Sequence, residues 1–354
     1  MSRQRSTCGI YREAMEAALQ NALGSLSNLP DVVMFELSKL KALVRGYHNR
    51  YAGDNVWRCL SVEEAVRFNI PQTDMVYVGM IDTMVENYGE TVMVEHKTIG
   101  RDVRPTDAYF QKLAYDGQVS LYHLAKYLDG NPIDQTIYDV VRKLTIKPKR
   151  IPAGKEGAIG TKSEIEEHGT YFGYDLGGDG VCPDRESPAL FELRCVHEVD
   201  ANPDKYFIRV GNVVRSEQQM AETLNDLVHV AKDIEQATET GAWYQNTTMC
   251  EKYGSPCEFM TLCRGVEDPE NVRWEPRKKS AISADNTLSY SGMSTFLTCR
   301  RKYYWRYIYG IQRRTETPPA LAFGKAFHLA LENWWQTFKA EQADEHKDES
   351  EQGI

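Results

Sequence analysis

The sequence predicts an α/β fold in which a mixed β-sheet is flanked by helices. Two segments rich in β-branched and apolar residues, Val76 to Val85 and Thr91 to Lys97, are joined by a short segment containing Gly89, a pattern typical of a β-hairpin. A helix over residues 106 to 128 and a further strand over residues 135 to 146 follow. This alternation of strands and helices indicates a layered α/β architecture.

The other elements follow from apolar periodicity and capping residues. Residues 10 to 50 have a helical apolar pattern through Leu37, Leu40, Leu43 and Val44. The helix over residues 106 to 128 begins at a capping Thr106 or Asp107 and ends at Asp129 and Gly130. Farther along the chain we expect a strand over residues 206 to 214 and helices over residues 216 to 238, 289 to 309 and 323 to 339.

Composition excludes several classes of protein. The chain has 354 residues and a formal net charge of -9, which argues against indiscriminate coating of nucleic acid but not against one basic groove. No apolar stretch approaches the roughly 20 residues needed to span a bilayer, and no secretion signal follows Met1. We therefore expect a soluble cytoplasmic protein with an acidic, disordered tail over residues 341 to 354.

The predicted hairpin carries the first candidate site. With a turn centred on Tyr88 and Gly89, Asp82 lies opposite Glu95, and Lys97 shares the Glu95 face while His96 points to the other. Two carboxylates this close repel each other unless a cation lies between them. Such a pair, holding Mg²⁺ or Mn²⁺ beside an ammonium group, is suited to phosphodiester hydrolysis. The alternative is a solvated polar hairpin face.

Two further polar pairs have helical spacing. Gln118 and Tyr122 lie four residues apart, as do His328 and Glu332. In the second helix an apolar stripe predicts the buried face and leaves His328 at its edge; the stripe consists of Phe327, Leu331, Trp334 and Phe338. Each pair alone is also compatible with an ordinary buried or solvated position.

Cysteines and a basic segment complete the candidates. Cys250, Cys257 and Cys263 have six and five residues between them, whereas the remaining cysteines outside the motif described next (Cys8, Cys59, Cys182 and Cys195) have no ligand spacing and are expected to be core residues. The segment from Cys299 to Arg314 interleaves basic and aromatic side chains. It suits binding of phosphates with stacking of bases, or equally an amphipathic helix with aromatic core residues; its candidate DNA-binding residues are Arg300, Arg301, Lys302 and Tyr303.

Taken together, these motifs resemble the RecB-like branch of the PD-(D/E)XK nucleases, which includes AddB-like and phage exonuclease-like proteins with an iron-sulfur cluster. The matching motifs are Ser289-Tyr290-Ser291, Cys299 to Tyr303, Gly324 to His328, Gly79 to Asp82, Glu95-His96-Lys97, Gln118 to Tyr122 and the three-cysteine segment. The resemblance implies a restriction-endonuclease-like mixed sheet with a helical, cluster-bearing portion.

The resemblance also implies roles for individual residues. Asp82, Glu95, His328 and the backbone carbonyl of His96 would bind Mg²⁺ or Mn²⁺, and Lys97 would assist the attacking water. Gln118 and Tyr122 would position the DNA backbone or Lys97. Four thiolates would hold a [4Fe-4S] cluster, namely those of Cys250, Cys257, Cys263 and Cys299. A zinc site with four cysteines is the rival, although zinc sites usually pair cysteines two to four residues apart.

The motifs occur in circularly permuted order, because the segment that opens the family pattern here closes the chain. We expect a nuclease core over residues 1–265, a linker over residues 266–287 and a segment over residues 288–340 that completes the nuclease. A partial second copy of the nuclease would repeat motifs of the first copy. The two pieces of this chain instead complement each other without overlap. Rejoining of the reading frame during assembly of the gene would produce the same order.

The resemblance thus implies a metal-dependent DNA nuclease, acting from DNA ends in recombination, repair or phage DNA processing. A helicase or a single-strand annealing protein is a possible partner type. Two alternatives are a catalytically inactive DNA-end-binding module of the same fold and an iron-sulfur electron carrier. The first is disfavoured by the presence of Asp82, Glu95 and Lys97, and the second explains none of the carboxylates.

Overall fold

The computed structural model describes residues 31–53, 57–149, 170–171, 174–175, 186–252, 254–279, 281–314 and 319–351. The helical prediction for residues 10 to 30 lies outside these ranges, as do Cys8 and Cys182. Within the described ranges, the longest apolar helices still fall short of what a bilayer span requires.

A mixed sheet of six strands forms the centre of the molecule, in the order β1-β2-β3-β4-β7 with β11 paired to β2. The strands β1 to β3 are antiparallel neighbours, β3 and β4 are parallel, and β4 and β7 are antiparallel. Their bounds are β1 (Trp57–Asn69), β2 (Val76–Asn87), β3 (Glu90–Ile99), β4 (Gln135–Arg142), β7 (Phe207–Val213) and β11 (Thr287–Leu288).

The hairpin prediction is confirmed in its turn and register. Tyr88 and Gly89 both have positive φ, at 52° and 85°, as the tight two-residue turns that match strand twist require. The paired residues of β2 and β3 run from Asn87 with Glu90 to Thr83 with Val94. Pairing stops there, so Asp82 and Glu95 come directly after the last paired residues rather than forming a further pair.

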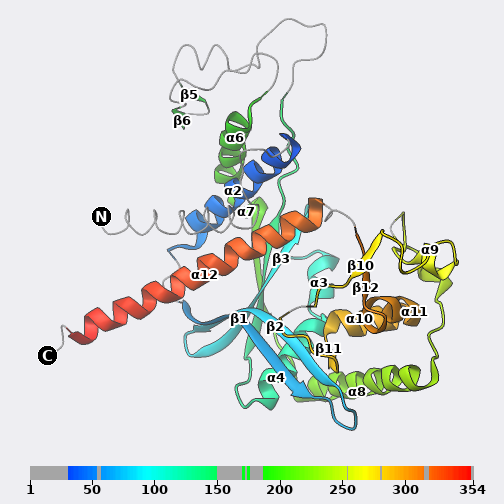
Figure 1. Cartoon of the computed structure of the whole chain (residues 1–354). Helices are drawn as coiled ribbons and strands as arrows, with labels where there is room; N and C mark the ends of the chain where they lie inside the picture. Colours follow the sequence, from blue (N-terminus) through cyan, green and yellow to red (C-terminus); the bar gives the residue numbers. More distant parts are fainter. Residues whose placement is uncertain are drawn as a thin grey trace, which may run out of the picture.

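Helices cover both faces of the sheet (Figure 1). The first face packs against α2 (Asp31–Tyr51), α6 (Pro188–Ala201), α7 (Pro203–Tyr206) and α12 (Pro319–Glu351). The second packs against α3 (Ala108–Leu113), α4 (Gly117–Leu128), α8 (Glu217–Thr240) and α10 (Tyr290–Thr298). A mixed sheet flanked by helices is therefore confirmed.

A third and smaller core lies beyond α8, around Phe259 and Trp274. Its elements are short: η2 (Thr247–Met249), β8 (Glu251–Lys252), β9 (Ser255–Pro256), α9 (Met260–Cys263), β10 (Trp274–Pro276), α11 (Arg300–Tyr303), the π-helical turn η3 (Tyr304–Ile308) and β12 (Ile311–Arg313). Strand β10 lies in the segment predicted as a linker and pairs with β12. The two-residue strands β5 (Thr170–Tyr171) and β6 (Tyr174–Asp175) pair with each other elsewhere.

Two helices were predicted as continuous and are broken. The helix expected over residues 106 to 128 is divided into α3 and α4, because Asp116 is extended and its side chain caps α4 by accepting from the Gln118 N–H. The helix expected over residues 289 to 309 is interrupted at Cys299, which has an extended backbone with φ of -165°. Both breaks fall next to predicted site residues.

The C-terminal helix is longer than predicted. We expected disorder over residues 341 to 354, whereas α12 continues to Glu351. Its Gln342 side chain donates to the carbonyl of Trp57 (2.6 Å) and accepts from the N–H of Cys59 (2.9 Å), and Lys339 Nζ donates to the carbonyl of Leu60 (2.5 Å). These side chains hydrogen-bond to the outer edge of β1.

Candidate active site and cysteine site

The candidate active site lies where the sheet opens. Strand β1 pairs with β2 along one edge, while the other edge is shared: β3 pairs with residues 83 to 87 and β11 with residues 76 and 77. Among the described residues, no strand pairs with residues 78 to 82 of β2 on that edge. Side chains from helices on both faces of the sheet therefore reach the same opening.

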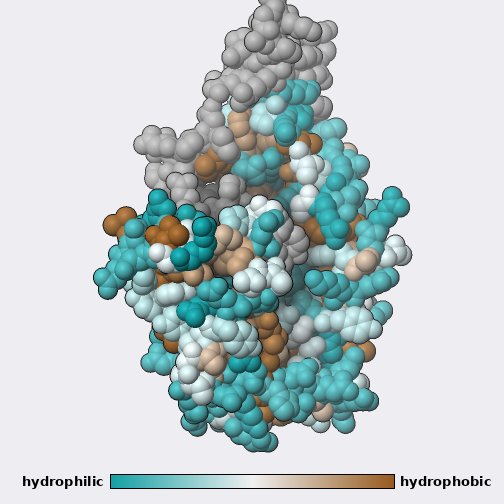
Figure 2. All heavy atoms as spheres, turned by 90° about the vertical axis from the view of Figure 1, so that its right-hand side faces the viewer, coloured by the Kyte–Doolittle hydropathy of each residue, from teal (hydrophilic) through white to brown (hydrophobic). Residues whose placement is uncertain are grey.

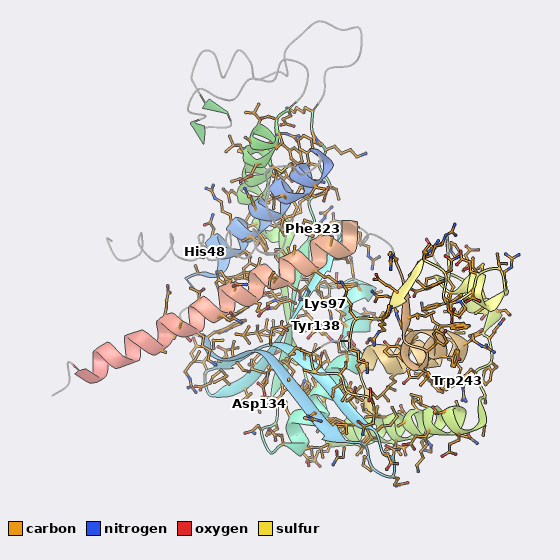
Figure 3. The ribbon with its side chains drawn as sticks, in the orientation of Figure 1. His48, Lys97, Asp134, Tyr138, Trp243 and Phe323 are labelled. Carbon is orange, nitrogen blue, oxygen red and sulfur yellow. The ribbon has the colours of Figure 1, made fainter. Side chains whose placement is uncertain are left out.

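Asp82, Glu95 and Lys97 come together at this opening. The backbone N–H of His96 donates to Asp82 Oδ2 (2.9 Å), and Lys97 Nζ donates to Glu95 Oε1 (2.5 Å). Figure 3 labels Lys97 near Tyr138 at the centre of the molecule, below α12. Met93 belongs to the core of the second face and Val94 to that of the first, so Glu95 follows Met93 toward α4 and His96 follows Val94 toward α12.

The charge of Glu95 is poorly compensated. Glu95 is 2% exposed, and within the described residues its Oε2 has no hydrogen-bond partner. Burial, and then the nearby Asp82, raise the pKa of Glu95 to about 7, although Lys97 opposes this shift. Burial acts to lower the pKa of Lys97, but Glu95 outweighs it, so the net shift is upward and Lys97 is an ammonium. A cation beside Oε2 would remove the repulsion.

Helix α12 brings His328 to Asp82. The distance from His328 Nδ1 to Asp82 Oδ2 is 3.9 Å. Burial lowers the pKa of His328, against the opposing effect of Asp82, which favours the neutral imidazole that metal binding requires. The predicted apolar stripe of α12 is buried. Near Gly324 the helix lies against β3, where an added Cβ would make an ordinary contact of 3.4 Å with Thr98 Oγ1.

Gln118 and Tyr122 lie on α4 at the other side of the opening. Gln118 Nε2 donates to the Tyr122 hydroxyl (2.7 Å), and burial raises the pKa of Tyr122. The Tyr122 ring occupies the place where Gly79 lacks a side chain, because an added Cβ would lie 2.6 Å from Tyr122 Cε1. The glycine three residues before Asp82 thus allows the ring to lie against β2.

Sequence reasoning missed Glu63 on β1. The register of β1 and β2 sets Glu63 across from Asp82, between the pairs Val62 with Thr83 and Glu64 with Ile81. Burial, then Asp82 and Glu332, raise the pKa of Glu63 to about 7. Because β1 was not predicted, no signal in the sequence separated Glu63 from the adjacent Glu64.

The described side chains of the site do not by themselves form a complete set of metal ligands. Within the described residues, no three His, Cys, Asp or Glu side chains are arranged as a metal-binding group. Protein donors occupy one oxygen on each carboxylate, since Lys97 holds Glu95 and the His96 N–H holds Asp82. A buried carboxylate oxygen of Glu95 without a partner among the described residues, together with the His328 imidazole beside Asp82, is nevertheless the type of donor that a divalent cation binds.

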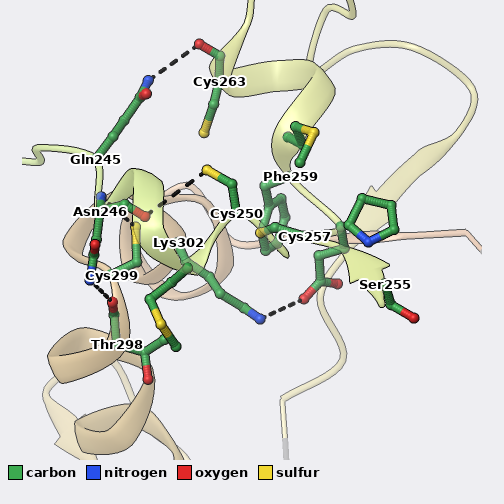
Figure 4. Close-up of a pocket in the computed structure, with 14 residues that line it drawn as sticks. Gln245, Asn246, Cys250, Ser255, Cys257, Phe259, Cys263, Thr298, Cys299 and Lys302 are labelled. Carbon is green, nitrogen blue, oxygen red and sulfur yellow. Dashed lines mark hydrogen bonds and ion pairs between the residues drawn. The ribbon is translucent and has the colours of Figure 1, made fainter. Parts of the chain in front are cut away.

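The four cysteines with predicted ligand roles line one cavity of about 210 Å³. Figure 4 shows the sulfur atoms of Cys250, Cys263 and Cys299 pointing into shared space, with Cys257 beside Phe259. All four are free thiols, and burial raises the pKa of Cys257 and of Cys263. Cys59 and Cys195 are buried free thiols elsewhere, as predicted.

Asn246 links the two sequence segments of this cavity. Its backbone N–H donates to Cys299 Sγ (3.4 Å), its side-chain amide donates to the carbonyl of Thr298 (2.9 Å), and its carbonyl lies 4.0 Å from Cys250 Sγ. The extended backbone at Cys299 therefore places this thiol next to the segment that carries the other three.

The family model of the PD-(D/E)XK nuclease superfamily matches residues 4–264 and 287–353. The chain belongs to the PD-(D/E)XK nuclease superfamily. Membership implies a metal-dependent nuclease, and the mixed sheet flanked by helices fits a restriction-endonuclease-like fold. Mg²⁺ or Mn²⁺ is the cation that nucleases of this superfamily generally use. No curated protein matches the chain.

In this nuclease the first three cationic side chains of the basic segment make contacts within the protein. Arg300 pairs with Asp233 (2.6 Å), Arg301 Nε donates to the carbonyl of Trp243 (2.6 Å) and Lys302 lies 3.5 Å from Glu258. Tyr303 is 3% exposed. Its ring belongs to the core of the second face, and a role of Tyr303 in DNA binding stays a prediction.

The face that carries the cysteine cavity is largely hydrophilic, with hydrophobic side chains in separate small areas (Figure 2). Between residues 250 and 310, the exposed apolar residues include Val266, Val272, Leu297 and Ile308. Figure 2 shows no single large hydrophobic patch on this face, and single exposed apolar residues need no binding partner to explain them.

Proposed function

We propose that the chain is a DNA nuclease that requires Mg²⁺ or Mn²⁺ and degrades DNA from an end, in recombination, repair or phage DNA processing. One observation carries the proposal. Asp82, Glu95 and Lys97 meet at the opening of the sheet, and the buried Glu95 Oε2 has no partner among the described residues.

The residues of the site would divide the chemistry as follows. Asp82, Glu95, His328 and the backbone carbonyl of His96 would hold the cation, which supplies a Lewis acid for the phosphate and a more acidic water. Lys97 carries a positive charge at the place where negative charge develops on the phosphate oxygens. Gln118 and Tyr122 orient Lys97 or the DNA backbone.

We place the chain in the RecB-like branch, with its motifs circularly permuted. The short distance between His328 and Asp82 supports the completion of the site by the C-terminal segment. Cys299 lines the same cavity as the three earlier cysteines, which supports it independently. The two matched ranges of the family leave out residues 265–286, close to the predicted linker.

The proposal assigns a [4Fe-4S] cluster to Cys250, Cys257, Cys263 and Cys299. Four free thiols around one cavity supply the ligand set, and the Asn246 N–H supplies a hydrogen bond to a sulfur atom, which is one of the contacts that tune such clusters. The cluster would join α11 to the segment between α8 and β10. Zinc bound by the same thiols is the competing assignment.

Cleavage of linear DNA tests the first part. Wild-type protein should degrade end-labelled linear DNA with Mg²⁺ or Mn²⁺ but not with EDTA, and should spare covalently closed circles. Asp82→Asn should remove this activity. Asp134→Asn is the matched control, because Asp134 Oδ2 accepts from the Thr91 N–H (2.7 Å) outside the site. DNA binding without cleavage in every cation would instead support an inactive DNA-end-binding module.

Metal analysis tests the second part. Protein purified without oxygen should be brown and contain about four irons and four sulfides. Stoichiometric zinc without iron would replace the cluster by a zinc site. Neither outcome depends on cleavage, so the two parts of the proposal are tested separately.

A further inference from the structure

A buried network crosses the sheet behind the candidate active site. The indole Nε1–H of Trp335, on α12, donates to His96 Nε2 on β3 (3.1 Å). His96 Nδ1 lies 3.3 Å from Asp139 Oδ2 on β4. The hydroxyl of Tyr47, on α2, donates to the same Asp139 oxygen (2.5 Å), and Arg209 Nη2, on β7, donates to that hydroxyl (3.1 Å).

The donors of this network fix the tautomer of His96. An indole N–H can only donate, so His96 Nε2 must be the accepting, unprotonated nitrogen. A ring proton then lies on Nδ1, which is 3.3 Å from Asp139 Oδ2 without meeting the geometry of a hydrogen bond among the described residues. Burial acts to raise the pKa of Asp139, but Arg209 and His96 outweigh it and hold it below its ordinary value, so Asp139 is an ionised acceptor.

The network forms a closed path with the active site. The backbone N–H of His96 donates to Asp82 Oδ2, and His328 Nδ1 lies 3.9 Å from that same oxygen. Trp335 follows His328 by two helical turns on α12. One hydrogen bond between Trp335 and His96 therefore joins the helix that carries His328 to the strand that carries Glu95 and Lys97.

We infer that Trp335 is a positioning residue, whose indole N–H locks the His96 ring and so sets the position of His328 relative to Asp82 and Glu95. This inference rests on the proposed cation site. Outer contacts of this kind typically change metal affinity by about 10- to 100-fold when they are removed.

The adjacent residue provides a matched control. Trp334 is also buried and donates its indole N–H to a histidine, His48 Nδ1 (3.2 Å), but that histidine lies on α2 away from the active site. Trp335→Phe and Trp334→Phe each remove one buried indole hydrogen bond from the same helix. They should therefore cost similar stability and differ in their effect on the cation.

The test measures Mn²⁺ affinity by electron paramagnetic resonance and the melting temperature of the full chain. Trp335→Phe should weaken Mn²⁺ binding about tenfold, and Trp334→Phe should leave it unchanged at a similar melting temperature. Excess Mn²⁺ should restore DNA cleavage by Trp335→Phe. Equal losses of affinity in both variants, or none in Trp335→Phe, would overturn the positioning role.

A measurement on the wild-type protein covers the case in which Trp335→Phe does not fold. In ¹⁵N-histidine spectra, the ring in contact with the Trp335 indole proton should be the neutral Nδ1–H tautomer. An Nε2–H ring would overturn the inference. If the wild-type protein binds Mn²⁺ and the two variants behave alike, the positioning inference alone is refuted. If the wild-type protein binds no Mn²⁺, the proposed cation site is refuted as well.

Discussion

The carboxylate site and the cysteine site are built in opposite ways. The carboxylate side chains lie on long strands of the main sheet and are held by protein donors, with Glu95 deeply buried and Asp82 half-buried. Of the cysteines, Cys263 lies at the end of the four-residue helix α9 and the other three lie between elements, and all four are partly exposed. Protein donors hold the first site before any cation binds, whereas the segments of the second are joined by a few contacts at partly exposed side chains, such as those of Asn246 and Lys302.

This difference indicates at which of the two sites a bound metal would contribute to the free energy of folding. Binding free energy becomes folding free energy where no stable site exists beforehand. We therefore expect loss of the active-site cation to remove activity with little loss of structure. Loss of a metal from the cysteines should instead destabilise the segment between α8 and α11.

The largest expected effect is on cleavage rate. Glu95→Gln should lower it by about three orders of magnitude, because it would remove a charged ligand from the proposed cation site. Its melting temperature in EDTA should be unchanged or higher, since the carboxylate repels Asp82. Rate and melting temperature are measured on the same sample, with Glu86→Gln, a surface partner of Arg58, as the control. Rapid turnover by Glu95→Gln would contradict the role of this residue.

The second largest effect is expected on stability and metal content rather than on cleavage rate. Cys263→Ser should lose bound metal and lower the melting temperature, with cleavage reduced only as far as folding is. Metal content and thermal melting measure this change. Cys195→Ala is the control, because Cys195 is a buried thiol outside the cavity, and it should retain the metal. A Cys263→Ser protein as stable and metal-rich as the wild type would show that this thiol is not a ligand.

A smaller effect is expected at Gly79. An added Cβ would lie 2.6 Å from the buried Tyr122 ring, so Gly79→Ala should cost about 1–3 kcal/mol of unfolding free energy. Gly100→Ala is the control, since nothing lies within 4 Å of an added Cβ there. Urea denaturation measures both. Equal stabilities would mean that Tyr122 does not need this space.

The smallest expected effect is the change of stability with pH that the buried carboxylates cause. The pKa of Glu95 is raised from 4.5 to about 7 in the folded protein. Between these values the folded protein keeps a proton that the unfolded chain releases, so stability without metal should fall as pH rises through this range. Denaturation midpoints in EDTA at several pH values measure the slope, to which Glu63 also contributes. Glu95→Gln should make it shallower, and an unchanged slope would contradict the buried charge.

The fold was predictable where local signals were strong. Alternating apolar residues and the turn at Tyr88 and Gly89 gave the hairpin and its register. Strand β1 was not predicted, because Glu63 and Glu64 interrupt its apolar pattern. The breaks at Asp116 and Cys299 depend on capping and on backbone conformation that propensity alone does not reveal.

The candidate site was predictable from motif spacing, whereas its surroundings were not. Spacing indicated that Glu95 and Lys97 share a face, and the buried stripe of α12 indicated where His328 lies. Asp139 and Trp335 gave no signal, since a lone aspartate in a strand and a tryptophan beside an apolar stripe are common. Their roles arise from contacts between residues far apart in the sequence, such as Trp335 with His96.

The side chains of α12 that bind the edge of β1 also affect association between molecules. An outer strand with unpaired backbone groups is a template for another strand, and Gln342 and Lys339 occupy such groups at Trp57, Cys59 and Leu60. The helix that carries His328 thus also protects this edge strand from pairing with another molecule. A chain truncated before Lys339 would expose part of this edge to intermolecular pairing even if its core stayed folded.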